Sequence, residues 1–229
     1  MIPTRRLVIL IWILAALGAA AFLAMAAAVG AGVTKGFDSA VLLGLRDASD
    51  LSNPWGPPWF ENTMVELSAL GGYPILVPVA LVSVAVLFLL GHRAAALFLL
   101  LALGSGTALS TGLKLFFDRA RPDLVMHLDK ISTASFPSGH ATVGMLAWMV
   151  LAVVAVRFVP LHRVRVFLLA AAFALAIVIG ASRVYLGVHW PSDVLAGWCL
   201  GLSWACLCWL AAHHLGSRRK GPDLGRSET

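Results

Sequence analysis

Three short clusters of polar residues carry the side chains suited to chemistry in this 229-residue chain. Each cluster combines a cation or an imidazole with small residues or prolines that leave the backbone accessible. They are Lys114 with Arg121 and Pro122; Pro137, Ser138, Gly139 and His140; and Ser182 and Arg183 with His189 and Asp193.

The cations of these clusters predict an anionic substrate. Lys114, Arg121 and Arg183 supply three fixed positive charges without an equal set of acids beside them. A phosphoryl group in transfer spreads negative charge over its oxygens, and the arginine fork contacts two oxygens at once. Ser138 is a candidate N-cap of a helix whose first N–H groups bind anions, and Gly139 allows close backbone approach.

The two histidines predict nucleophilic catalysis with acid assistance. His189 and Asp193 are four residues apart at the start of an apolar run, a spacing at which a carboxylate reaches an imidazole nitrogen. That contact fixes the tautomer and leaves the other nitrogen as a nucleophile. His140 is then available to protonate a leaving oxygen. Three flanking cations would repel a divalent ion, so we expect no metal and no cofactor.

Composition indicates that a membrane surrounds these clusters. Hydrophobic residues make up 60% of the chain and charged residues 12%, against about 25% charged in soluble domains. The net charge of +6 comes from bases beside apolar runs, which favours a membrane surface over nucleic acid. Apolar runs near the ~20 residues of a spanning helix predict an all-α polytopic protein with six transmembrane helices. They cover 7–33, 72–91, 94–117, 139–159, 164–182 and 191–215.

The distribution of Lys and Arg predicts the orientation, because cytoplasmic loops carry the excess. With both termini in the cytoplasm, the three clusters fall on the outer side of a bacterial-type inner membrane. Ten bases then lie inside: Arg5, Arg6, Arg93, Arg157, Arg163, Arg165, Arg218, Arg219, Lys220 and Arg226. Seven lie outside: Lys35, Arg46, Lys114, Arg119, Arg121, Lys130 and Arg183.

The chain is expected to form one membrane-embedded domain over 1–215, with the motifs in 114–193 and a disordered cytoplasmic tail over 216–229. The first outer loop, 34–71, has two apolar sets separated by a turn-rich break at 53–58. Short amphipathic helices with Trp and Phe suit the membrane interface. This loop is either a cap packed on the bundle or a lateral gate for a lipid, and the two are compatible.

Other polar residues are interpreted as structural. Those in the outer loop after the third span are expected to be solvated or salt-bridged rather than catalytic: Asp118, Arg119, Asp123, His127, Asp129 and Lys130. Isolated residues at helix ends usually satisfy local contacts or extend to the interface. That applies to His92, Arg93, His162, His213 and His214.

The three clusters resemble the signature of the type 2 phosphatidic acid phosphatase superfamily. Its Lys-x6-Arg-Pro, Pro-Ser-Gly-His and Ser-Arg-x5-His-x3-Asp motifs are filled at every fixed position over residues 114–193. The resemblance implies His189 as a nucleophile that forms a phosphohistidine, Asp193 as the residue that orients it, and His140 as general acid and then base. It implies phosphoryl binding by Lys114, Arg121, Ser138, Gly139 and Arg183, with Pro122, Pro137 and Ser182 supporting the motifs.

These features together predict a metal-independent lipid phosphate or diphosphate phosphatase acting at the outer membrane face. The resemblance implies undecaprenyl diphosphate, phosphatidylglycerol phosphate and phosphatidate as the candidate substrates. The alternatives are a lipid A phosphatase or a lipid-to-lipid phosphotransferase with the same site. A carrier that binds a lipid phosphate without cleaving it is disfavoured, since nucleophile and acid are both present.

Overall fold

Long apolar runs force this chain into helices, because a peptide group in hydrocarbon must find its hydrogen bond within its own segment. The computed structural model describes residues 5–129 and 133–219, with residues 216–219 in backbone course only. The elements are α1 (Arg5–Gly30), α2 (Lys35–Gly44), α3 (Pro58–Ala69), α4 (Tyr73–Leu89), α5 (Arg93–Phe117), α6 (Gly139–Ala155), the 3₁₀ turn η1 (Val156–Phe158), α7 (His162–Tyr185) and α8 (Pro191–Arg219). The predicted all-α fold is confirmed.

The predicted spans coincide with α1, α4, α5, α6, α7 and α8. All of these except α4 are individually long and apolar enough to cross a membrane. The α4 helix has 17 residues, short of the ~20 that a span needs. Only together with α3, from which it is bent by 44°, is α4 long and apolar enough to cross a membrane. The protein therefore has five candidate spans, or six if α3 and α4 act as one.

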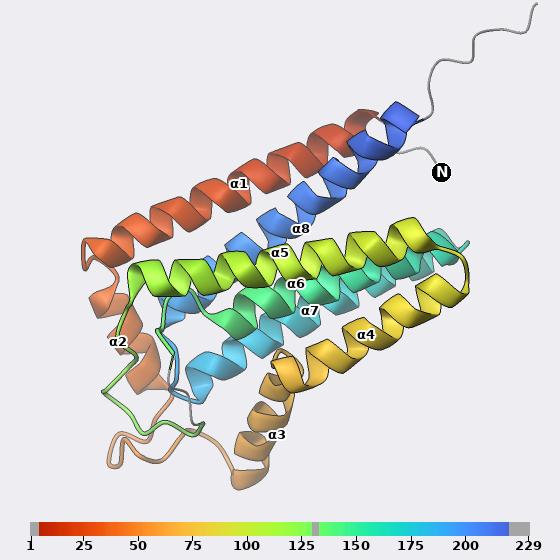
Figure 1. Ribbon diagram of the computed structural model, residues 1–229. Coiled ribbons are helices and arrows are strands. Elements are labelled where there is room, and N and C mark those ends of the chain that lie inside the picture. Colours follow the sequence, from red (N-terminus) through yellow and green to blue (C-terminus); the bar gives the residue numbers. More distant parts are fainter. Residues whose placement is uncertain (1–4, 130–132, 220–229) are drawn as a thin grey trace, which may run out of the picture.

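The loop over 34–71 contains the two short helices that its apolar spacing predicts, α2 and α3. Figure 1 shows both at one end of the bundle, away from the start of α1 and the end of α8. Trp55 and Trp59 are exposed on them and on the turn between them. α2 contacts α8 and α3 contacts α7, so these helices cap the bundle at that end.

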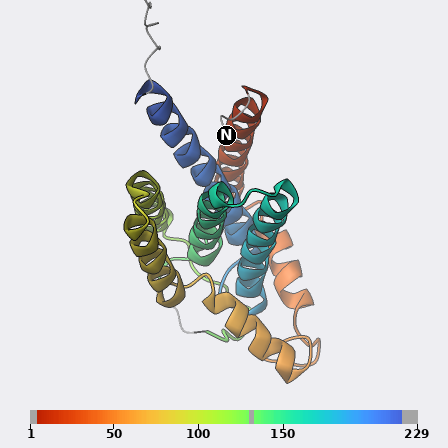
Figure 2. The same cartoon turned by 90° about the vertical axis from the view of Figure 1, so that its right-hand side faces the viewer.

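The α6 helix lies at the centre of the bundle, where it contacts α5, α7 and α8 (Figure 2). Buried residues make up 56% of its span, against 11% of the peripheral α1. Its contact with α8 is close because α8 presents two glycines there. A Cβ at Gly201 would lie 2.4 Å from the carbonyl oxygen of Thr142, and one at Gly197 would lie 2.9 Å from that of Ser138. The first turn of α6 is therefore packed closely against the second and third turns of α8.

Two breaks in the backbone change the direction of the chain, one after α5 and one between α3 and α4. α5 ends at Asp118, which adopts a left-handed conformation with φ 40°, and its N–H donates to the carbonyl of Lys114 at 3.0 Å. Short polar side chains tolerate this conformation best after glycine. The second break separates α3 from α4 at Gly71, where a Cβ would lie 2.3 Å from the side chain of Ile179.

α8 continues as a helix to Arg219, four residues into the segment 216–229 predicted as a disordered tail. Residues 220–229 lie outside the described residues. The disorder of this segment stays a prediction there.

The α6–α8 contact predicts that Gly201→Ala destabilises the protein. The added methyl would meet the backbone carbonyl of Thr142, which cannot rotate away, so the helices must separate at a cost of about 1–3 kcal/mol. Thermal unfolding in detergent should show a lower midpoint. Gly104→Ala is the matched control, since a Cβ there meets nothing within 4 Å. An equal midpoint for the two variants would contradict the packing argument.

Candidate active site

The three polar clusters meet at the end of the bundle where α2 and α3 lie (Figure 1). Lys114 stands in the last turn of α5, and Arg183 stands in the last turn of α7. His140 is in the first turn of α6, and Asp193 is in the first turn of α8. Residues up to 79 positions apart in sequence thus come to one end, as the sequence predicts.

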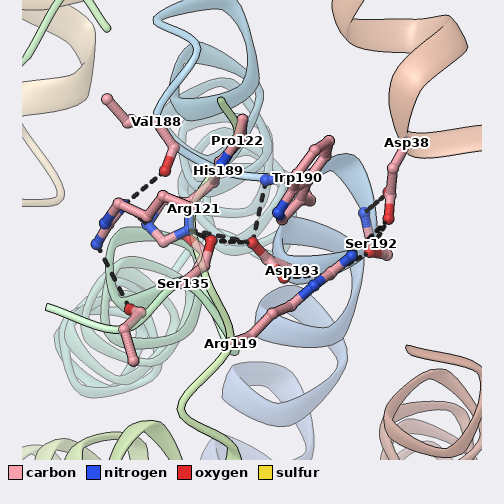
Figure 3. Close-up of polar contacts among 12 residues, drawn as sticks. Asp38, Arg119, Arg121, Pro122, Ser135, Val188, His189, Trp190, Ser192 and Asp193 are labelled. Atoms are coloured by element: carbon pink, nitrogen blue, oxygen red, sulfur yellow. Dashed lines mark hydrogen bonds and ion pairs between the residues drawn. The ribbon is translucent and has the colours of Figure 1, made fainter. Parts of the chain in front are cut away.

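The imidazole of His189 is held from both sides (Figure 3). Its Nδ1 lies 3.4 Å from the Asp193 carboxylate, and its Nε2 lies 3.3 Å from a guanidinium nitrogen of Arg121. The side chain is 2% exposed. Contact with the carboxylate favours the proton on Nδ1, so the Nε2 lone pair faces the cations.

The electrostatic surroundings keep His189 neutral. Burial lowers the pKa of its imidazole to about 3, with the Asp193 carboxylate opposing that shift and the positive charges of Arg121 and Lys114 adding to it. The side chain therefore carries no proton on Nε2 near neutral pH. A neutral imidazole is the form that attacks phosphorus.

The Asp193 carboxylate is fully buried and fully bonded. Besides His189, it accepts hydrogen bonds from the Ser135 hydroxyl at 2.5 Å and the Trp190 N–H at 3.0 Å, both at Oδ2. At Oδ1 it pairs with Arg119 at 2.6 Å. Charge-assisted bonds of this kind hold a carboxylate ionised in an apolar setting.

The Arg119 guanidinium also forms an ion pair with the carboxylate of Asp38 on α2, at 2.9 Å. It also donates to the Ser192 hydroxyl at 2.8 Å, and its guanidinium lies 5.4 Å from the ring of Trp190. Figure 3 shows these contacts continuing the row that begins at His189. Arg119 was expected to be solvated or salt-bridged, and it is salt-bridged.

Arg121 is fixed by carbonyl oxygens and keeps no carboxylate partner among the contacts that the structure describes. It donates to the carbonyl of Thr133 at 2.8 Å and to that of Val188 at 2.5 Å. Burial, together with the nearby charge of Arg183, lowers the pKa of Arg121 to about 10. It therefore stays positive at neutral pH, beside Nε2 of His189.

Lys114 lies across the start of α6. Its Nζ donates to the carbonyl of Ala134 at 2.6 Å, and a Cβ on Gly139 would lie 3.4 Å from its Cε. The glycine thus leaves the lysine and the first N–H groups of α6 open to the same anion. His140 follows Gly139, and a Cβ on Gly72 would lie 3.4 Å from its Nε2.

Arg183 is 1% exposed and only partly satisfied. One of its nitrogens, Nη1, donates to Ser68 at 2.6 Å and to Asp129 at 2.8 Å. Its Nε and Nη2, and the hydroxyl of Ser138, are buried and find no partner among the described residues. Buried donors without partners are costly. An anion that accepts hydrogen bonds from these donors would satisfy them.

The three supporting residues serve local structure. The Ser182 hydroxyl donates to the Ile179 carbonyl in its own helix at 2.7 Å. The Pro122 carbonyl oxygen lies 2.5 Å from Nε2 of His127. Pro137 follows a cis peptide bond. Lys130 lies outside the described residues.

Four residues of the site were not singled out by the sequence motifs. Ser135 and Arg119 contact Asp193, Ser68 contacts Arg183, and Asp38 contacts Arg119. The only sequence signal for Asp38 is that it is the single acid in a short helical stretch of mainly apolar residues. Within the described ranges, no group of three or more His, Cys, Asp or Glu side chains is placed to hold a metal ion.

This chain is similar in sequence to a known family and to several known proteins. The PAP2 superfamily matches residues 95–216. Phosphatidylglycerophosphatase B of Bacillus subtilis is 34% identical over 148 residues, which are 63% of this chain and 71% of that protein. An undecaprenyl-diphosphatase of Sulfolobus acidocaldarius is 37% identical over 70 residues, 31% of this chain and 29% of that protein.

A solved structure is similar over nearly the whole chain. It is the crystal structure of a transmembrane PAP2-type phosphatidylglycerolphosphate phosphatase from Bacillus subtilis. The TM-score is 0.76 at 29% identity, covering 93% of this chain and 98% of the other. Because 93% of this chain is covered, the similarity extends well beyond residues 95–216.

Proposed function

This chain belongs to the PAP2 superfamily and is a multi-pass membrane lipid phosphate phosphatase, and we propose that it cleaves its substrate through a phosphohistidine at His189. The observation that supports this most is the position of the His189 imidazole. Its Nδ1 is held by a buried carboxylate while its Nε2 faces Arg121. A nucleophile oriented by an acid and aimed at a cation is suited to attack on a phosphoryl group.

In the first step, the substrate phosphoryl group is bound by Lys114, Arg121 and Arg183 and by the backbone at the start of α6. Nε2 of His189 forms a bond to phosphorus, and the bond from phosphorus to the lipid oxygen breaks. His140 gives its proton to that oxygen. The imidazole becomes positive as it accepts the phosphoryl group, and the Asp193 carboxylate stabilises that charge.

In the second step, His140 accepts a proton from water. The water oxygen bonds to phosphorus as the bond to Nε2 of His189 breaks, and inorganic phosphate is released. These side chains supply the nucleophile, the acid and base, and the compensating charges for both steps. The proposal therefore includes no metal and no cofactor.

Phosphatidylglycerol phosphate is the substrate to test first. The relative matched over 71% of its length is named phosphatidylglycerophosphatase B. Undecaprenyl diphosphate and phosphatidate follow. Transfer of the phosphoryl group from His189 to a second lipid uses the same first step, so product analysis with an added acceptor lipid distinguishes transferase from hydrolase. A lipid A phosphate tests the remaining alternative.

The His189→Ala variant should lose phosphate release by at least about a thousand-fold, because removing a covalent nucleophile removes the reaction path. The measurement is phosphate release from the three lipids by protein in detergent, with EDTA present throughout. His162→Ala, exposed at the start of α7, is the matched control and should keep wild-type activity. Substantial turnover by His189→Ala would reject His189 as the nucleophile.

The His140→Ala variant should separate the two steps. With p-nitrophenyl phosphate the leaving oxygen needs little protonation, so the phosphoenzyme still forms, but its hydrolysis lacks a base. We expect a rapid burst of about one p-nitrophenolate per active site followed by slow turnover, and almost no reaction with a lipid phosphate. Equal losses of burst and turnover on both substrates would contradict the assigned role.

We further propose that the site faces the outer side of a bacterial-type inner membrane. Two features support it. Counted over the terminal segments and the joining segments together, ten bases lie on the predicted cytoplasmic side and seven on the other. The helices α2 and α3 and the motif residues lie at the end of the bundle opposite to the start of α1 and the end of α8 (Figure 1).

Cysteine labelling tests this orientation. A cysteine at the exposed Ala48 should react with a membrane-impermeant maleimide in intact cells. One at the exposed Leu161, before α7, should react only after permeabilisation. The reverse pattern would place the site on the cytoplasmic side.

A further inference from the structure

Asp38 is a buried acid that the proposed reaction does not use. It stands in the first turn of α2 with a side chain that is 0% exposed. Its Oδ1 accepts the N–H of Ser192 at 2.9 Å, and its Oδ2 accepts the Ser192 hydroxyl at 2.7 Å. Its only ion pair among the described residues is with Arg119. The two bonds to Ser192 hold the Asp38 side chain against the first turn of α8.

Arg119 connects this acid to the proposed catalytic pair. Nη2 pairs with Asp38 at 2.9 Å while Nη1 pairs with Asp193 at 2.6 Å. Both carboxylates are 0% exposed and the arginine side chain is 17% exposed. A single guanidinium thus spans two buried carboxylates, and the second of them holds the imidazole of His189 (Figure 3).

The charges of this group matter for the reaction. Asp38, Arg119 and Asp193 together carry a net charge of minus one, from two carboxylates and one guanidinium. When His189 accepts a phosphoryl group, its imidazole becomes positive, so the group of four becomes neutral. Without Asp38 the group would be neutral at the start and positive after the transfer, next to three further cations. Positive charge then develops in a less favourable field.

We propose that Asp38 is a positioning residue that, through Arg119, sets the orientation and charge of the carboxylate holding the nucleophile. Asp38 also keeps Arg119 from pairing with Asp193 alone, which would draw the carboxylate away from the imidazole. The inference rests on the proposed function, because it assigns Asp38 to the phosphorylation of His189. The capping helix α2 is on this view part of the catalytic apparatus.

The test is the Asp38→Asn variant in the full-length protein. It removes the charge while leaving a side chain of the same shape and an oxygen for Ser192. We expect the rate of phosphoenzyme formation to fall about ten-fold, with inhibition by inorganic phosphate unchanged within about two-fold. Inhibition by phosphate reports on binding at Lys114, Arg121 and Arg183. Asp38 contacts none of these three in the part of the chain that the structure describes. If Asp38 had a purely structural role, the substitution would slow phosphoenzyme formation and would also weaken inhibition by inorganic phosphate.

Two controls distinguish charge from packing. Asp47→Asn makes the same substitution at an exposed aspartate between α2 and α3, whose carboxylate accepts hydrogen bonds from Ser49, and it should behave as wild type. Ser192→Ala removes the two hydroxyl bonds of this group without changing its charge. Its loss of rate should be smaller than that of Asp38→Asn.

The outcomes separate this inference from the proposed function. A wild-type protein that forms no phosphohistidine overturns the proposed function and this inference with it. A phosphohistidine that forms equally fast in wild type and Asp38→Asn overturns the inference alone, as does an equal loss of rate and phosphate affinity. If Asp38→Asn does not fold, Arg119→Lys takes its place, because one ammonium cannot bridge both carboxylates as the planar fork does. Slower phosphorylation with unchanged phosphate inhibition then supports the inference, and full rate overturns it.

Discussion

The carboxylate of Asp193 is completely buried at the start of a membrane-embedded helix, and the rest of the site depends on keeping it charged there. An unpaired ion in such a place costs several kcal/mol. The chain meets this cost with donors from the two segments that precede α6 and α8: the Arg119 guanidinium, the Ser135 hydroxyl and the Trp190 N–H. The location of Asp193 at the positive end of α8 adds to its stabilisation. With the carboxylate secured, the imidazole of His189 has a fixed tautomer.

The cations show the opposite condition, an incomplete set of contacts. Arg121 and Lys114 rest on carbonyl oxygens, and Arg183 leaves two nitrogens without partners in the described part of the chain. Three positive charges close together repel one another, so this arrangement costs stability in the absence of an anion. The same features would suit a phosphoryl group, because donors for its oxygens are already in place. The carboxylate of Asp193 is therefore satisfied by its partners, whereas the cations keep donors that an anion could use.

The sequence predicts the parts of this arrangement that are local. Apolar length identifies the helices, and the four-residue spacing of His189 and Asp193 predicts their contact. The shortness of α4 and its bend from α3 were not predicted, because the bend is decided by the packing of Gly71 against Ile179. Partners separated by more than a hundred residues left no periodic signal. Asp38 and Ser192 are 154 residues apart, and only the folded chain brings them together.

Asp38 and Ser68 both lie before residue 95, where the family match begins. The segment over 95–216 contains every motif residue, yet in isolation it would leave Arg119 with one of its two carboxylates and Arg183 without its serine. The part of the chain that carries the family signature is thus smaller than the part that completes the site. A fusion or truncation made at residue 95 would remove α2 and α3, and with them the contacts of Asp38 with Arg119 and of Ser68 with Arg183.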